Sequence, residues 1–96
     1  MPRFIVVHTM TLDEQSLKVL AKEALTVFAK EVQSAGESSK VAWRLSYCDF
    51  ADNKFFCEWE ARNRGELESV FQVMDMPYDA IYPVRLFNVA KGDFED

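Results

Sequence analysis

The sequence predicts one α+β domain, residues 1–96, in which strands and helices follow one another in the order βαββαβ. The first indication is a set of short apolar or alternating segments, typical of strands, at Arg3–Thr9, Val41–Asp49, Lys54–Ala61 and Ala80–Asn88. The second is a pair of longer segments between them in which apolar residues recur at helical spacing. The third is the length of 96 residues, which suits a single domain of this kind.

The first strand and the first helix are predicted from different signals. Phe4–Val7 is an unbroken apolar run, typical of a central strand that is covered on both faces. Thr11 is expected to cap the following helix, Glu14 to complete a capping box, and Gly36 to end the helix. Its buried stripe follows the spacing of three or four residues, namely Leu17, Leu20, Ala21, Ala24, Phe28 and Val32.

The two middle strands form a hairpin, and the length of its loop decides which side chains share a face. A two-residue loop would place Cys48 opposite Cys57, where a disulfide is conceivable. A three-residue loop, 51–53, places Tyr47 opposite Cys57 and puts Asn53 in the left-handed conformation that asparagine tolerates. Patterning favours the three-residue loop because it keeps the acidic residues of the return strand apart from the aromatic ones. We therefore predict no disulfide.

The second helix and the last strand complete the fold. Asn63 is expected to cap the helix, with Glu66 at its third position. Pro83 cannot donate to a strand ladder, so the last strand belongs at an edge of the sheet. Right-handed crossovers then give a four-stranded antiparallel sheet in the order 4-1-3-2 with both helices on one face. This arrangement is the ferredoxin-like fold.

The sheet is expected to have one face covered by the helices and one open face. The covered face is predicted to hold Ile5, Val7, Trp43, Leu45, Tyr47, Phe55, Cys57, Trp59, Val84 and Leu86. The open face is predicted to hold Phe4, Val6, His8, Arg44, Ser46, Cys48, Phe56, Glu58, Glu60, Arg85 and Phe87. Large apolar side chains in the centre of an open face indicate a partner. We therefore predict a homodimer in which two open faces pack together and enclose their polar residues in a cavity.

The composition disfavours several other partners. The 11 Lys and Arg residues are outnumbered by 16 Asp and Glu, give a formal charge of −5 and do not cluster, which disfavours nucleic acid. No segment approaches the roughly 20 apolar residues of a membrane span, and the apolar run near the N-terminus is too short for a signal peptide. We expect a cytoplasmic protein that binds neither nucleic acid nor membranes.

Four segments carry a resemblance to a known family: the opening Met-Pro-Arg-Phe-Ile-Val, the pair Ser-Tyr at 46–47, Phe-Cys-Glu-Trp-Glu-Ala at 56–61 and Pro-Tyr-Asp-Ala-Ile-Tyr-Pro-Val at 77–84. They resemble a family of small bacterial ferredoxin-like proteins that includes a nickel-binding member. The resemblance implies a dimeric α+β-barrel arrangement and a transition metal such as nickel. The chain departs from the family pattern at Asp75 and Met76, where members often have a glycine, and at 68–70, where some carry a histidine.

His8, the only histidine, is the first candidate metal ligand. If the first and third strands run parallel with Phe4 beside Phe56, His8 lies beside Glu60 on the open face. Imidazole with carboxylates suits nickel or zinc, so His8, Glu60 and Glu58 are the predicted ligands. The predicted cavity around them is lined by Phe4, Val6, Arg44, Ser46, Cys48, Phe56 and Arg85. The alternative is a histidine that is hydrogen-bonded to a carboxylate at a subunit interface.

Three functions stay open on the sequence alone. The leading hypothesis is a dimeric protein without enzymatic activity that binds a metal in the cavity. The rival is a cofactor-independent enzyme of the monooxygenase or isomerase type, with Glu58 and Glu60 as general acid and base on a small hydrophobic substrate. Those two carboxylates could equally form ordinary ion pairs with Arg44 and Arg85. The third hypothesis is an assembly module without a small ligand.

Overall fold

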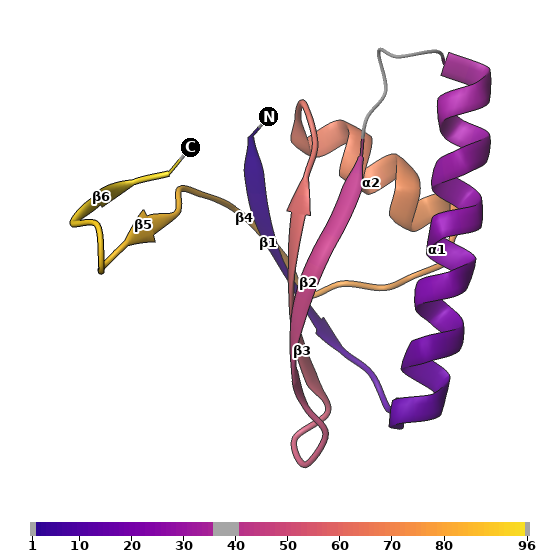
Figure 1. Ribbon diagram of the computed structural model, residues 1–96. Helices are drawn as coiled ribbons and strands as arrows, with labels where there is room; N and C mark the ends of the chain where they lie inside the picture. The colour runs from indigo at the N-terminus through magenta and orange to yellow at the C-terminus, as the bar shows by residue number, and fades with distance from the viewer. Residues whose placement is uncertain (1, 36–40, 96) are drawn as a thin grey trace.

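The protein is described by a computed structural model that covers residues 2–35 and 41–95, with residues 26–35 described by their backbone alone (Figure 1). The elements are β1 (Arg3–Thr9), α1 (Glu14–Ala35), β2 (Ala42–Asp49), β3 (Lys54–Glu60), α2 (Arg64–Val73), β4 (Ala80–Val84), β5 (Phe87–Asn88) and β6 (Asp93–Phe94). The main sheet is antiparallel with the order β2-β3-β1-β4, and both helices lie on one side of it. The predicted ferredoxin-like class and strand order are confirmed.

The last predicted strand is shorter than expected. Pro83 does lie in an edge strand, but β4 ends at Val84, whereas the sequence predicts a strand to Asn88. The chain then leaves the sheet, and β5 pairs with β6 in a separate two-stranded hairpin. We call residues 85–95 the C-terminal arm. It projects from the side of the sheet opposite the helices (Figure 1).

The two helices begin at capped ends. Asn63 caps α2 as predicted, because its Oδ1 accepts a hydrogen bond from the Glu66 backbone N–H at 3.0 Å. α1 begins at Glu14, and the carboxylate before it, Asp13, accepts the Ser16 backbone N–H at 2.7 Å, the role expected of Thr11. The predicted helix end at Gly36 lies outside the described residues. The side chains of Phe28 and Val32, predicted for the buried stripe, lie outside them too.

The faces of β1 are the reverse of the prediction. Phe4, Val6 and His8 are all buried, at 6% exposure or less, on the side of the helices. Ile5 and Val7 are half-buried on the open face. An unbroken apolar run has no alternation from which a face could be inferred. The prediction that His8 lies on the open face is therefore wrong, because its side chain is buried on the covered face.

The predicted neighbours of β1 on β3 also change. The two strands run antiparallel, which places His8 opposite Phe55 and Arg3 opposite Glu60. The parallel pairing assumed for Phe4 and Phe56 is wrong, because the crossover through α1 makes β1 and β2 parallel and the β2–β3 hairpin then reverses the direction of β3. His8 and Glu60 therefore lie near opposite ends of the sheet, and on opposite faces.

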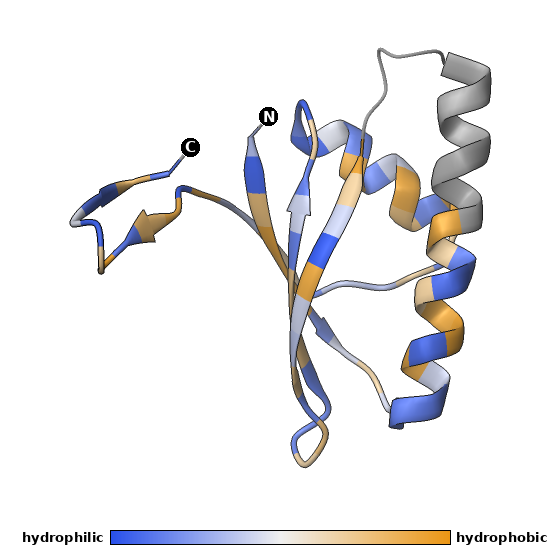
Figure 2. Cartoon of the chain, in the orientation of Figure 1, coloured by the Kyte–Doolittle hydropathy of each residue, from blue (hydrophilic) through white to orange (hydrophobic). Residues whose placement is uncertain are grey.

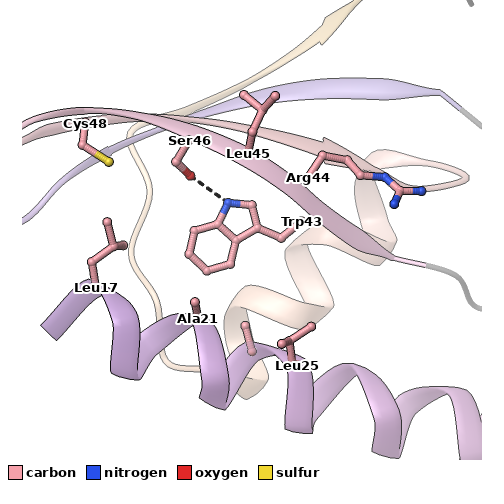
Figure 3. A pocket seen from close by; sticks show the side chains of 9 residues that line it. Leu17, Ala21, Leu25, Trp43, Arg44, Leu45, Ser46 and Cys48 are labelled. Atoms are coloured by element: carbon pink, nitrogen blue, oxygen red, sulfur yellow. Dashed lines mark hydrogen bonds between the residues drawn. The ribbon is translucent and has the colours of Figure 1, made fainter. Parts of the chain in front are cut away.

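A β-bulge decides the faces of β2. The register shifts between Trp43 and Leu45, so that Trp43, Ser46 and Cys48 all point toward α1 while Leu45 points away from it (Figure 3). Tyr47 is 68% exposed. The prediction that Trp43, Leu45 and Tyr47 share the covered face is wrong for the last two. A bulge breaks the alternation on which that prediction rested.

The hairpin loop is one residue longer than predicted. Asp49 pairs with Lys54 and the loop spans 50–53, so Ser46 rather than Tyr47 lies opposite Cys57. The Asp49 carboxylate accepts hydrogen bonds from the backbone N–H groups of Ala51 and Asp52, both at 3.1 Å. These bonds stabilise the longer loop. Asn53 is left-handed with φ 56°, as predicted. Both cysteines are free thiols.

The core between the sheet and the helices is centred on Trp59, which is fully buried. Its ring stacks on Trp43 with centroids 5.5 Å apart, and Phe71 of α2 meets it edge-on at 5.1 Å. The predicted covered-face residues of β3 are all confirmed in this core, namely Phe55, Cys57 and Trp59. Among the described residues, no helix is both long enough and apolar enough to cross a membrane.

A buried histidine pocket as the candidate functional site

His8 is held in one orientation beneath the helices. Its side chain points into the core from β1 and meets the Phe71 ring of α2 edge-on, with centroids 5.5 Å apart. The Nδ1 atom lies 2.7 Å from the backbone carbonyl of Pro77. A carbonyl can only accept, so Nδ1 carries the proton and donates it. Nε2 is then left with a lone pair that points into the protein.

The Nε2 atom of His8 is buried and has no hydrogen-bond partner. Burial lowers the pKa of the imidazole, against the opposing effects of the Pro77 carbonyl and the Asp79 carboxylate, so the ring is neutral near pH 7. A buried polar atom without a partner costs about 1–3 kcal/mol. Such an atom is an unusual feature that indicates a ligand, because a ligand would relieve that cost.

The pocket around His8 is small, and three of its lining residues carry sulfur. Cys57 lines it from β3, and two methionines line it from other segments, Met10 after β1 and Met76 after α2. The remaining walls are apolar and comprise Leu12, Leu17, Leu20, Trp43, Phe55 and Trp59. Burial raises the pKa of the Cys57 thiol to about 11, although the Ser46 hydroxyl donates to its sulfur at 3.0 Å. Cys57 is therefore protonated in the protein at neutral pH.

An open groove of about 360 Å³ lies beside this pocket, between α1 and β2. Figure 3 shows it with Leu17, Ala21 and Leu25 on the helix side and the indole of Trp43 across from them. The Trp43 Nε1 donates to the Ser46 hydroxyl at 2.7 Å. Leu17 and Trp43 line both the groove and the His8 pocket, so the two spaces adjoin.

The other two predicted metal ligands lie on the open face and are occupied by arginines. Glu58 accepts from Arg3 at 3.1 Å, and Glu60 accepts from Arg44 at 2.9 Å. The hydrogen bond from Arg44 is the main cause that lowers the pKa of the Glu60 carboxyl. These carboxylates are ion-paired, as one of the alternatives held, although the partner of Glu58 is Arg3.

The structure does not bring the three predicted ligands together. His8 is on the covered face, and both glutamates are on the open face. Within the described residues, no group of three or more His, Cys, Asp or Glu side chains is placed to hold a metal ion. A site made of His8, Glu58 and Glu60 in one chain is therefore excluded by the sheet that separates them.

The predicted cavity residues are likewise divided. Phe56 is on the open face, 41% exposed. Phe4 and Val6 are core residues, and Ser46 and Cys48 line the groove on the helix side. Arg85 lies in the C-terminal arm, with its guanidinium 4.0 Å from the centroid of the Phe94 ring. Arg44 borders the groove and reaches Glu60.

The comparisons with known proteins agree with this fold. The family model described as "Nickel responsive protein SCO4226-like" matches residues 4–84. The chain belongs to the SCO4226-like family. The crystal structure of SCO4226 from Streptomyces coelicolor A3(2) is similar to it, with a TM-score of 0.70 at 20% sequence identity, over 88% of this chain and 96% of that one. No curated protein matches. The resemblance inferred from the short segments is thus confirmed, and the match ends where β4 ends.

Sequence reasoning missed most of the surroundings of His8 in this member of the SCO4226-like family. Met10 and Met76 are 66 positions apart along the chain and meet only through the fold. The Pro77 carbonyl that orients the ring is a backbone group and leaves no trace in composition. One signal was present for Met10, which is an apolar residue directly after the predicted strand Arg3–Thr9.

Proposed function

We propose that this SCO4226-like protein binds a transition-metal ion through Nε2 of His8, in the pocket beneath its helices. The orphaned Nε2 lone pair is the observation that carries the proposal. Histidines that ligate metals usually donate their other ring N–H to a carbonyl or carboxylate, which fixes the ring and the tautomer. The hydrogen bond from Nδ1 to the Pro77 carbonyl is of this kind. The neutral ring has no proton to lose at Nε2 before it binds.

The donors near His8 suit a soft or borderline ion. Three sulfur-bearing residues line the same pocket, namely Cys57, Met10 and Met76, and sulfur with imidazole favours ions such as Cu(I), Ni(II) or Zn(II) over Mg²⁺ or Ca²⁺. Because the family is described as nickel responsive, nickel is the first ion to test. An ion bound to Cys57 would displace its proton, so affinity should rise with pH.

The test is metal uptake by the untagged chain, measured by equilibrium dialysis and elemental analysis with Ni(II) and, under reducing conditions, Cu(I). We expect up to one ion per chain, with at least tenfold weaker binding in Met76→Leu and loss of binding in His8→Gln. Met74→Leu is the matched control, because Met74 packs against the core without lining the pocket. Uptake that His8→Gln leaves unchanged, or none at all in the unaltered chain, contradicts the proposal.

We further propose that the protein acts as a homodimer through the open face. Tyr47, Phe56 and Tyr82 are 68%, 41% and 54% exposed on that face, and Leu45 on β2 is 44% exposed. An exposed apolar surface of this kind is typical of an interface. Pairing two open faces would also enclose the Arg3–Glu58 ion pair, which is already largely shielded from solvent.

Sedimentation of the unaltered chain and of Phe56→Glu tests the dimer. The carboxylate would be buried without a partner at the interface, so we expect the dimer dissociation constant to rise at least 100-fold. Val19→Glu is the matched control, because Val19 is similarly exposed, at 48%, but lies on α1. An unaltered chain that sediments as a monomer at every concentration contradicts the dimer.

The groove supports a second candidate, a cofactor-independent enzyme for a small apolar substrate. A ligand lying along Leu17 and Trp43 would be adjacent to the His8 pocket, where the neutral imidazole could accept a proton from it. Native mass spectrometry distinguishes the candidates. A bound organic molecule in metal-free protein, displaced in Ala21→Trp, would favour the enzyme, and an empty metal-free protein would favour a module without a ligand.

A further inference from the structure

The C-terminal arm is a well-specified hairpin that contributes nothing to the core of its own chain. Phe87 and Phe94 meet edge-on with centroids 5.1 Å apart, and Arg85 lies over the Phe94 ring. Gly92 takes the left-handed conformation at the turn, with φ 66°. Lys91 pairs with Glu95 at 2.7 Å. Nevertheless no residue between 85 and 95 is buried.

An arm of this kind needs a surface to pack on. A single two-stranded hairpin is at best marginally stable in water, and this one exposes Phe87, Val89 and Phe94 by 49%, 84% and 46%. The hydropathy colouring shows its apolar segments far from the helices and from the core (Figure 2). The arm projects away from its own sheet, so its own open face does not cover these side chains.

We propose that the arm reaches across the dimer interface and packs its apolar side chains on a second copy of this chain. The arm and the exposed open face lie on the same side of the sheet (Figure 1), so two open faces that pair about a two-fold axis would each meet the other chain's arm. Residues 85–89 span about 16 Å when extended, at roughly 3.3 Å per residue, which exceeds the spacing of about 10 Å between packed sheets. The arm is long enough to reach the partner.

The exposed aromatic surface area is also large enough to contribute to a dimer interface with a second copy of the chain. Five aromatic side chains on the open face and the arm are between 41% and 68% exposed, namely Tyr47, Phe56, Tyr82, Phe87 and Phe94. At roughly 200 Å² for each full side chain, they hold about 500 Å² of accessible surface. A stable dimer buries about 800 Å² on each partner. The aromatic residues therefore supply more than half of that area, and the arm supplies a substantial part of it.

The arm lies outside the region that the family model matches, which ends at residue 84. On this proposal the arm makes the dimer tighter than the open faces alone would. The inference rests on the homodimer proposed above. Two open faces could pair without the arm, so its contact with the partner is a separate claim.

The experiment uses the full chain with Val89→Glu, and Val19→Glu as the matched control. Val89 is 84% exposed, so the substitution removes little side-chain contact within its own chain. We expect the dimer dissociation constant, measured by sedimentation, to rise at least tenfold in Val89→Glu and to stay unchanged in Val19→Glu. Isotope-filtered NMR on mixed labelled and unlabelled chains should show contacts from the Val89 methyl groups to the partner.

The outcomes separate the arm from the dimer. If the unaltered chain is a dimer but Val89→Glu leaves its dissociation constant unchanged, or the Val89 methyl groups show no contact between chains, the role of the arm is overturned and the paired sheets stand. If the unaltered chain is a monomer, the homodimer fails and the arm proposal fails with it.

Discussion

The two faces of the sheet are built from alternate residues of the same strands, yet they differ in how complete they are. On the covered face, Trp43, Trp59 and Phe71 pack ring against ring, and His8 is the only buried polar residue among those described. On the open face, Phe56 and Tyr82 remain half-exposed beside two arginine–glutamate pairs. The single chain therefore buries the apolar side chains of one face and leaves those of the other face exposed, where association would bury them.

The largest expected difference between the faces is in what a large-to-small substitution costs. Trp59→Ala should lower the free energy of unfolding by about 3–5 kcal/mol, because it removes a fully buried ring that touches two other rings. Tyr82→Ala, at 54% exposure, should cost about 0.5 kcal/mol or less in the monomer. Urea denaturation at low protein concentration measures both.

Raising the protein concentration sharpens this prediction. If the open faces pair, the cost of Tyr82→Ala grows with concentration, since the dimer then contributes to stability. The cost of Trp59→Ala should depend much less on concentration. Equal costs for the two substitutions at low concentration would mean that the covered face is no better packed than the open one.

The next largest effect is a pH dependence of stability that is due to His8, the buried polar residue of the covered face. Burial holds the pKa of His8 below its ordinary value of 6.5, so the unfolded chain takes up a proton that the folded chain does not. Stability should therefore fall as the pH drops through and below 6.5. Between pH 7.5 and 5.5 the loss should reach up to about 1.4 kcal/mol. Chemical denaturation in buffer with a chelator measures it.

His8→Gln serves as the control for that pH dependence. His8 is the only histidine, so the variant should show little change in stability over the same interval. The Glu60 carboxyl has a lowered pKa and does not titrate in this interval. A stability that rises on acidification in the unaltered chain would show that the imidazole is not buried in its neutral form.

The smallest effect is expected from the ion pairs of the open face. Arg44 is 55% exposed in its pair with Glu60, and such pairs contribute about 0.2–1 kcal/mol. Arg44→Gln should therefore cost no more than about 1 kcal/mol, and less in about 1 M salt, where screening is strong. A larger cost that salt does not reduce would indicate that the pair is enclosed by a partner.

The sequence predicts the two faces unequally well, for reasons that particular strands illustrate. In β3 the alternation of Phe55, Cys57 and Trp59 with Phe56, Glu58 and Glu60 is regular, and its faces are as predicted. In β1 four apolar residues follow one another, and nothing local distinguishes the faces. The packing of the whole core decides that His8 points inward, and a segment of four residues does not contain that information.

The candidate site was the least predictable part of the molecule. The bulge after Trp43 moves Ser46 and Cys48 to the helix side, and no glycine or proline marks it in the sequence. The departure of the chain after Val84 is similarly unmarked, because Phe87 continues the apolar character of the strand. Element order and caps follow from local chemistry, whereas faces and sites depend on contacts between distant segments.

The hydrogen bond from His8 to Pro77 has a mechanical consequence. It joins two residues that are 69 positions apart, one in the central strand and one in the connection between α2 and β4. A ligand bound to Nε2 leaves this hydrogen bond in place, so the position of the ring depends on the connection that carries Pro77. Occupation of the interior and the position of the connection are then linked in both directions, each altering the equilibrium of the other. Pro77 is exposed, so a single backbone oxygen joins the buried ring to a segment at the surface of the protein.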